Sequence, residues 1–153
     1  MKVWRLCARS HEAFDGEGAR LAGGRWNRLG TAVVYTSATL SLAAQELFVH
    51  LDPDQVPSSL VAVSAEIPNG LRVRILTAAD LPPDWRQYPA PELLADIGNA
   101  WIEAGETSVL AVPSAVISQE TNYLLNPAHK DFLKIRIHAA EPFAFDPRMW
   151  KKK

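Results

Sequence analysis

Hydrophobic positions recur along this chain in short runs separated by turn-forming residues. Runs rich in β-branched and aromatic residues are typical of strands, as is strict alternation of apolar and polar positions. The segments that fit a strand are 3–6, 32–36, 60–67, 109–112, 132–137 and 143–145. The clearest alternation places four side chains on one face: Val61, Val63, Ala65 and Ile67. The pattern therefore predicts a sheet of short strands.

Two longer segments follow a helical period instead. Residues 40–51 carry an apolar stripe made of Leu40, Ala44, Leu47, Phe48 and Leu51. Ser37 or Thr39 is suited to cap the first turn. A second helix is expected to begin near Pro91 and to end before Gly105, with a buried face of Leu94, Ile97 and Trp101. Strands with helices scattered among them predict an α+β fold in a single domain.

Composition supports one folded domain. The 153 residues, 48% of them hydrophobic and 22% charged, suffice to bury a core without a disulfide or a metal. Lys and Arg total 16 against 17 for Asp and Glu. The resulting pI of about 6.4 is far from the strongly basic values of domains that bind nucleic-acid phosphates. We therefore expect no direct nucleic-acid binding by this chain.

Targeting signals and metal-binding patterns are absent from the sequence. No apolar run approaches the roughly 18 residues of a membrane span, and the start MKVWRL lacks a signal-peptide pattern. We expect a cytoplasmic protein without membrane contact. Cys7 is the single cysteine, and the four histidines show no paired spacing. We accordingly expect no metal site.

The segment 16–27, GEGARLAGGRWN, contains four of the eight glycines and has no strong helix or strand period. Glycines let the backbone approach a ligand closely. A guanidinium presented on such a loop, as that of Arg25 would be, is suited to bidentate binding of a pyrophosphate. Arg20 lies in the same segment and competes for this role. An exposed turn with a solvated arginine is the alternative interpretation.

Three polar side chains flank the predicted strands and the first helix. Tyr35, at a strand end, is placed either to stack on a flat heterocycle or to pack in the core. Glu46 lies beside the apolar stripe of its helix, where it faces either a cleft or solvent. Ser114, just past a strand, either binds a ligand hydroxyl or satisfies a local turn. No G-x-S-x-G motif surrounds it, so it is a poor nucleophile candidate.

A last polar group lies in residues 120–129, ETNYLLNPAH. Asn122, Asn126 and His129 are spaced among apolar residues, which suits the wall of a pocket. They equally suit turns, because Asn followed by Pro, as at Asn126–Pro127, commonly initiates one. The segment therefore predicts either a pocket wall or a turn.

Together and in this order, these segments resemble the RES-domain family, which is named for an arginine, a glutamate and a serine. The matching segments are GGRWN at 23–27, VVYTS at 33–37, SLAAQE at 41–46, VPSA at 112–115 and NYLLNPAH at 122–129. Trp85 and FAFDPR at 143–148 also match, so the resemblance runs from Trp4 to Arg148. It implies a RES domain at 1–148 with an ADP-ribosyltransferase-like β core and a few helices. Residues 149–153 are expected to be a disordered basic tail.

The resemblance also implies roles for individual residues. Arg25 corresponds to the family's arginine, and Tyr35 and Glu46 are implied in the same catalytic site. Ser114 corresponds to the family's serine and is implied as a substrate-binding residue. The remaining substrate-binding candidates come from the same motifs: Trp26, Asn27, Ser37 and Asn126.

The implied function is that of the toxin in a type II toxin–antitoxin system, which cleaves the nicotinamide–ribose bond of NAD+, depletes cellular NAD+ and arrests growth. NAD+ is then the substrate, and no metal is needed. The implied partner is a cognate Xre-type (helix-turn-helix) antitoxin, and this chain is either a monomer or a homodimer in the complex. The chemistry agrees, because a carboxylate such as Glu46 stabilises a ribosyl cation. The alternatives are a mono-ADP-ribosyltransferase acting on a host protein and a non-enzymatic or RNA-directed toxin.

Overall fold

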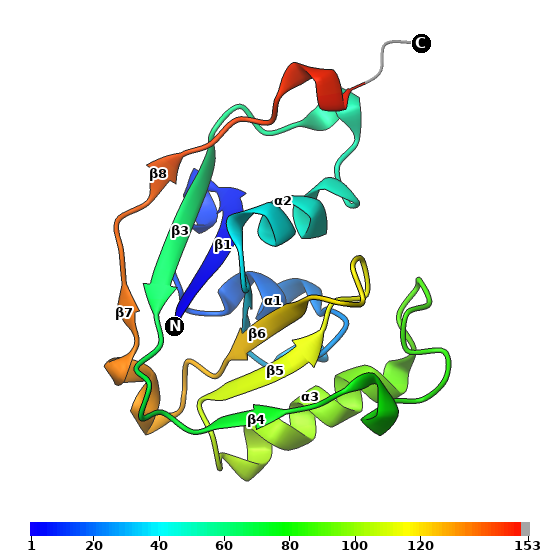
Figure 1. The fold of residues 1–153 in the computed structure, drawn as a ribbon, viewed down its shortest axis with the longest axis vertical. Coiled ribbons are helices and arrows are strands. Elements are labelled where there is room, and N and C mark those ends of the chain that lie inside the picture. Colours follow the sequence, from blue (N-terminus) through cyan, green and yellow to red (C-terminus); the bar gives the residue numbers. More distant parts are fainter. Residues whose placement is uncertain (151–153) are drawn as a thin grey trace.

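Eight short strands form one curled sheet in the computed structural model, which describes residues 1–150 (Figure 1). The strands are β1 (Lys2–Ala8), β2 (Val34–Ser37), β3 (Leu60–Glu66), β4 (Val73–Ile75), β5 (Val109–Pro113), β6 (Thr121–Leu125), β7 (Arg136–Ile137) and β8 (Glu141–Pro142). Their order is β4-β5-β6-β2-β1-β3-β7, and β8 pairs with β3 outside this path. All neighbours run antiparallel except β4 and β5. Residues 151–153, which belong to the expected tail, lie outside the described residues.

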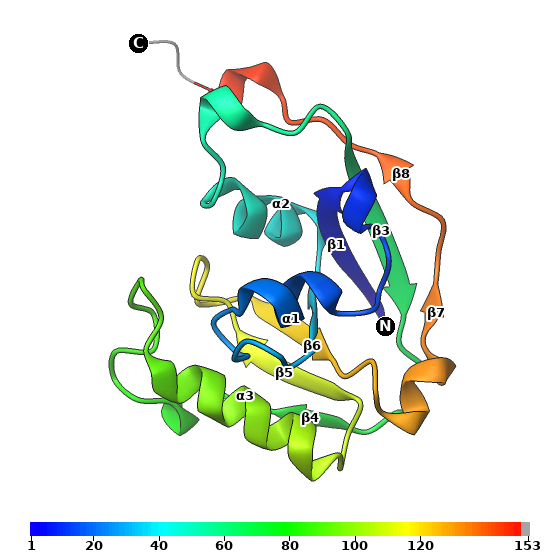
Figure 2. The same ribbon diagram turned by 180° about the vertical axis from the view of Figure 1, so that it is seen from behind.

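Three α-helices within residues 1–150 accompany the sheet: α1 (Glu17–Ala22), α2 (Leu40–Phe48) and α3 (Glu92–Ala104). Figure 2 shows α1 and α3 in front of β5 and β6, whereas α2 lies beside β1. The predicted α+β fold is confirmed. Of the described helices, none is long and apolar enough to cross a membrane.

The sheet is joined only narrowly at its middle. β1 pairs with β3 over its whole length, from Lys2↔Glu66 to Ala8↔Leu60, and β2 pairs with β6 from Val34↔Leu125 to Ser37↔Asn122. Between β1 and β2, in contrast, Trp4↔Ser37 is the single registered pair. Accordingly, β1 and β3 run in a different direction from β4, β5 and β6 (Figure 1). The end of β2 is therefore the point where the two halves of the sheet meet.

The core consists of three clusters, and β3 contributes side chains to two of them. The alternation predicted for β3 is confirmed: Val61, Val63 and Ala65 pack in one cluster, while Leu60 and Ala62 pack in another, against α2. α2 begins after Thr39, whose hydroxyl accepts a hydrogen bond from the N–H of Leu42, so Thr39 is the cap. Its buried residues are Leu42 and Ala43, which the predicted stripe omitted. Leu40, Ala44 and Leu47 of that stripe pack against the same cluster but are only partly buried.

α3 follows its predicted boundaries closely. Pro91 precedes its first turn, and Gly105 ends it in the left-handed region at φ 61°. Its buried residues are Leu94, Ala95, Gly98 and Trp101, which face a cluster of large side chains that includes Trp26, Trp85, Leu110 and Leu124. This packing fixes the segment 23–27 and the segment that leads into α3 on the same face of the sheet.

Two predicted strands are wrong near the C-terminus. Residues 130–134 form a 3-10 helix, η4 (Lys130–Lys134), and only Arg136–Ile137 pair as β7. η4 is capped by His129, whose Nδ1 accepts from the N–H of Asp131 at 3.0 Å. The registered pairs with β3 are those of Glu141 and Pro142, and the N–H of Phe143 still donates to the carbonyl of Leu60 at 2.9 Å. Beyond this point the rings of Phe143 and Phe145 pack edge to face.

The same aromatic cluster reaches the end of α2. The ring centroid of Phe145 lies 5.7 Å from that of Phe48, and the ring of Trp150 lies 4.8 Å from Phe48. Phe48 ends α2 two residues after Glu46. The segment after β8 therefore packs against the helix that carries Glu46.

Four α-helices or strands were missed from the sequence: α1, β4, β6 and the two-residue β8. α1 has only six residues, one of which is a glycine, and β4 has three. β6 begins with two polar residues, Thr121 and Asn122, so its apolar pattern is visible only in its second half. Such short or mixed segments carry too little periodicity to identify.

The close packing of α3 against residue 26 gives a test of the fold. A Cβ added at Gly98 would lie 1.7 Å from the carbonyl oxygen of Trp26, which is backbone and cannot rotate away. We expect Gly98→Ala to lower the free energy of unfolding by about 2–3 kcal/mol, despite the better helix propensity of alanine. Urea unfolding measures this. Gly18→Ala is the matched control, because nothing lies within 4 Å of its added Cβ. Equal stability of the Gly98→Ala variant and the parent would contradict this packing.

Candidate functional site

A carboxylate on α2 is held by both strands of the β5–β6 pair. The Oε1 atom of Glu46 accepts a hydrogen bond from the hydroxyl of Ser114 at 2.6 Å and another from the side-chain amide of Asn122 at 2.6 Å. Ser114 directly follows β5, and Asn122 lies in β6. No group within residues 1–150 donates to the other oxygen, Oε2. Glu46 therefore has one oxygen fixed and one available.

Further hydrogen bonds hold the two donors in place. The Ser114 oxygen accepts from the backbone N–H groups of Val116 at 3.1 Å and Ile117 at 2.9 Å, so its own proton is directed at Glu46. The hydroxyl of Ser37, at the end of β2, donates to Oδ1 of Asn122 at 2.8 Å. That bond orients the Asn122 amide with its NH₂ group toward the carboxylate. Ser114 is 0% exposed, so it acts on the site through Glu46.

Arg25 lies on the loop that follows α1. Its guanidinium donates from one nitrogen to the carbonyls of Trp85 at 2.7 Å and Gln87 at 3.1 Å. Within the described chain it forms no ion pair. Burial lowers the pKa of Arg25, and the nearby charge of Glu46 opposes this by raising it. An arginine stays protonated under such shifts, so a half-buried positive charge faces the site with most of its donors unused.

Tyr35, on β2, fixes this loop through its hydroxyl. The hydroxyl oxygen accepts from the backbone N–H of Trp26 at 3.0 Å and donates to Oδ1 of Asn27 at 2.7 Å. Burial raises the pKa of Tyr35 well above its ordinary value, so the phenol stays neutral. A Cβ added at Gly24 would lie 2.7 Å from this hydroxyl, which explains the glycine at that position. The hydroxyl is thus committed to the structure of the loop.

An open cavity of about 1010 Å³ lies between the Arg25 loop, the end of α2 and residues 86–90. Its polar lining consists of Arg25, Glu46, His50, Arg86 and Tyr88. A volume near the upper end of the usual ligand-pocket range suits a ligand larger than a single nucleoside. The cavity carries two guanidiniums against one carboxylate, so it suits an anionic ligand.

A second cavity, of about 700 Å³, adjoins the first at Glu46. It lies against β1 and β2, and Tyr35, Ser37 and Asn122 are among its lining residues. Glu46 and His50 line both cavities. The carboxylate therefore stands where the two cavities meet.

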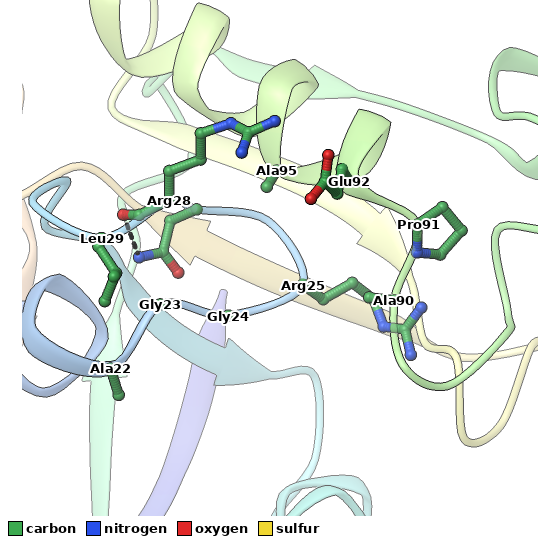
Figure 3. A pocket seen from close by; sticks show the side chains of 11 residues that line it. Ala22, Gly23, Gly24, Arg25, Arg28, Leu29, Ala90, Pro91, Glu92 and Ala95 are labelled. Atoms are coloured by element: carbon green, nitrogen blue, oxygen red, sulfur yellow. Dashed lines mark hydrogen bonds between the residues drawn. The ribbon is translucent and has the colours of Figure 1, made fainter.

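A smaller hollow of about 480 Å³ lies on the other side of the glycine loop (Figure 3). Here Arg28 forms an ion pair with Asp96, with Nε and Oδ1 2.6 Å apart. Glu92 also lines the hollow, and the Arg25 side chain extends away from Arg28 toward Ala90 (Figure 3). Arg28 is already paired with Asp96, and Arg25, which also lines the hollow, extends toward Ala90, a residue shared with the largest cavity (Figure 3). The hollow therefore offers a phosphate less than the largest cavity does.

The structure brings together Arg25, Tyr35 and Glu46 around the two cavities. Ser37 and Ser114 join them through hydrogen bonds to Asn122 and Glu46. Three of the substrate-binding candidates have other roles. Each is nearly fully buried: Trp26, Asn27 and Asn126.

The reasons differ for these three residues. The Trp26 ring packs with Trp85 and Trp101 in the core. The Asn27 amide donates to the carbonyls of Ala19 and Thr31, so it shapes the loop. Asn126 follows β6 at the end away from the site, and its Oδ1 accepts from the N–H of Ala128 in a turn. Of the two interpretations of Asn126, the turn is the one that the structure has.

Sequence reasoning missed four residues of the cavities: His50, Arg86, Tyr88 and, as a site residue, Asn122. The spacing of Asn122 identified it as a candidate for the wall of a pocket. Its hydrogen bond to Glu46 could not be predicted without the register of β6 against β2 and β5. His50, Arg86 and Tyr88 lie outside the recognised motifs. Within residues 1–150 no three His, Cys, Asp or Glu side chains gather as metal ligands do.

Comparison with known proteins places this arrangement in context. The model of the RES domain matches residues 2–146. The Prs ADP-ribosylating toxin of Sphingobium sp. (strain YBL2) is 37% identical over 155 residues, covering 97% of this chain and 96% of that protein. Toxin Res of Yersinia enterocolitica is 37% identical over 153 residues, covering 97% and 99%. The fold is similar to a chain in the crystal structure of the M. tuberculosis MbcT–MbcA toxin–antitoxin complex, with TM-score 0.76, 17% identity, and 93% and 83% coverage.

The Tyr35 hydroxyl gives a test that separates loop structure from ligand stacking. Tyr35→Phe keeps the ring but leaves the backbone N–H of Trp26 and the side-chain Oδ1 of Asn27 without this partner. We expect a loss of about 1–3 kcal/mol in the free energy of unfolding, measured by urea denaturation. Tyr123→Phe is the control: within residues 1–150 the hydrogen bond to Tyr123 from a side chain goes to its backbone carbonyl, and none involves its hydroxyl. If Tyr35→Phe is as stable as the parent, the hydroxyl does not hold the loop.

Proposed function

The chain belongs to the RES-domain family, and from this premise we propose that it is the toxin of a toxin–antitoxin pair and that it cleaves the nicotinamide–ribose bond of NAD+. Depletion of NAD+ then arrests growth. The observation that carries the proposal is the position of Glu46: one oxygen is held by Ser114 and Asn122, while the other is available beside Arg25 in a cavity of about 1010 Å³.

Cleavage of the nicotinamide–ribose bond requires a negatively charged carboxylate near the ribose and no general acid. When the bond from the ribose carbon to nitrogen breaks, its electron pair goes to the cationic pyridinium nitrogen and neutral nicotinamide leaves. The ribose carbon becomes positively charged, as in glycoside hydrolysis. A full charge pair at about 4 Å contributes about 4 kcal/mol at an effective dielectric constant of about 20. Glu46 Oε2 supplies that negative charge from a fixed position, so little reorganisation is required.

The two guanidiniums suit the rest of the dinucleotide. Arg25 has donors left after binding the carbonyls of Trp85 and Gln87. Arg86 lines the same cavity and is itself anchored by its Nε, which donates to the carbonyl of Ala115 at 3.1 Å. Charge-assisted hydrogen bonds from arginine to phosphate are among the strong ones. We assign the pyrophosphate to these two side chains, with the nicotinamide ribose at Glu46.

The acceptor of the ADP-ribosyl group defines two candidate reactions. With water, the new bond forms to the water oxygen, a proton passes to solvent, and ADP-ribose is released. Inorganic phosphate would accept in the same manner. Transfer to a protein side chain is the second candidate, favoured by the name of the Sphingobium relative, an ADP-ribosylating toxin. Both reactions share the bond that breaks, so both need Glu46.

The partner we propose is a cognate antitoxin of the Xre type, with a helix-turn-helix DNA-binding domain. The structural neighbour was solved in a toxin–antitoxin complex, which supports a protein partner for this chain. A homodimer within that complex remains an option. The net charge of −1 and the pI of about 6.4 do not favour the alternative of an RNA-directed toxin.

Removing the charge of residue 46 tests the catalytic assignment. We expect Glu46→Gln to lower the rate of nicotinamide release from NAD+ by roughly 10²–10³ with the fold retained, because the amide keeps the size but not the charge. Nicotinamide is quantified by chromatography, and circular dichroism checks the fold. Glu103→Gln, on the exposed side of α3, is the matched control. Turnover at the parent rate would exclude Glu46 as the catalytic carboxylate.

Expression in cells without the antitoxin separates the two acceptors. If water or phosphate accepts, cellular NAD+ falls before growth stops, and Glu46→Gln abolishes both effects. Mass spectrometry of NAD+ and of protein-bound ADP-ribose reads out each case. Constant NAD+ together with ADP-ribosylated protein would overturn NAD+ depletion and establish the second candidate. Arrest with neither change would contradict both.

A further inference from the structure

The large cavity has an aromatic rim that the bond-breaking chemistry leaves without a role. Tyr88 is 78% exposed although its ring is large and apolar. Its ring lies 6.0 Å from that of His50, measured between centroids, with 53° between the ring planes. Tyr88 and His50 come from segments on either side of the cavity, and both line it. An exposed aromatic pair of this kind offers a face on which a planar ring can stack.

Three kinds of group line the cavity: the carboxylate of Glu46, the guanidinium of Arg25 and the rings of His50 and Tyr88. His50 follows the end of α2 at Phe48, and it lines the cavity together with Glu46. Tyr88 lies beyond His50, across the cavity mouth. The guanidinium of Arg25 donates to the carbonyl of Gln87, the residue next to Tyr88, at 3.1 Å. An anion bound by Arg25 would therefore lie beside the segment that carries Tyr88.

We infer that Tyr88, with His50 beside it, stacks on the adenine ring of NAD+ and selects the dinucleotide over its nicotinamide half. The inference rests on the proposed function. NAD+ has a ring at each end of a pyrophosphate, and the nicotinamide ribose must lie at Glu46 for the bond to break. With the pyrophosphate on Arg25, the adenosine half extends toward residues 87–88. The nicotinamide ring stays attached to the carbon at Glu46, on the opposite side of the pyrophosphate from the adenosine half.

Stacking of this kind predicts a particular kinetic effect. Removal of an aromatic side chain from a stacked base weakens binding by about 5-fold to 150-fold. The adenine lies far from the bond that breaks, so the contact is the same in the ground state and in the transition state. Its loss therefore raises KM and leaves kcat almost unchanged. Nicotinamide mononucleotide, which lacks adenine, cannot make the contact at all.

The experiment compares both substrates on three variants of the full chain. We expect Tyr88→Ala to raise KM for NAD+ at least about fivefold, with the KM for nicotinamide mononucleotide changed less than about twofold. Tyr88→Phe retains the ring and is expected to restore the parent KM for NAD+. Leu133→Ala removes an even more exposed side chain, 90% exposed on η4, and controls for nonspecific surface effects. An equal rise for both substrates, or no rise for either, would overturn the adenine site.

Binding of AMP distinguishes failure of this inference from failure of the proposed function. Calorimetry with AMP needs no turnover, so it reports on the adenine site even if the chain does not cleave NAD+. Weaker binding of AMP by Tyr88→Ala, restored in Tyr88→Phe, supports the site in either case. Unchanged AMP binding by Tyr88→Ala overturns it, whatever the activity toward NAD+.

Discussion

A single carboxylate oxygen, Oε1 of Glu46, connects the parts of this molecule that form the site. It accepts from Ser114 after β5 and from Asn122 in β6, so it ties α2 to both strands of that pair. This tie spans the place where the sheet is held together by the single registered pair Trp4↔Ser37. Because Ser37 also orients Asn122, the narrow joint of the sheet and the geometry of the carboxylate depend on each other. The cavities lie where they do because the two halves of the sheet meet at this carboxylate.

The same reasoning explains why residues of the site serve structure and chemistry together. Arg25 holds the backbone of residues 85–87 with one nitrogen and has other donors left for an anion. The Tyr35 hydroxyl holds the loop that carries Arg25. Ser114, fully buried, fixes Glu46 and does not line the cavity. Loss of activity on changing Tyr35 or Ser114 therefore needs a stability measurement beside it, since either change disturbs the support of a charged group.

Arg25, Tyr35 and Glu46 were assigned from the sequence through their joint match to the RES-domain pattern, because the local signal of each residue alone left a structural alternative open. Such local signals did not show which of the two residues Asn122 and Asn126 lies at the site. The two lie four residues apart along one stretch, and only the pairing of Asn122 with Ser37 and with Val112 shows which end of β6 faces Glu46. Trp26 follows Arg25 directly, yet its ring enters the core. The side chains of Arg86 and Tyr88 line the cavity because α3 and the segment before it pack on that face of the sheet. Residues 86–90 have no hydrophobic period from which this position could be predicted.

The most direct test of this account is a crystal structure of the Glu46→Gln variant with NAD+ bound, in which slow turnover preserves the substrate. The central claim is that the unpaired oxygen of residue 46 faces the ribose carbon whose bond to nicotinamide breaks. We expect that carbon within about 4 Å of the side chain at position 46, as in a near-attack geometry, and the pyrophosphate against Arg25. A complex with NAD+ bound outside both cavities, or with the adenosine half at residue 46 in place of the nicotinamide ribose, would contradict the account.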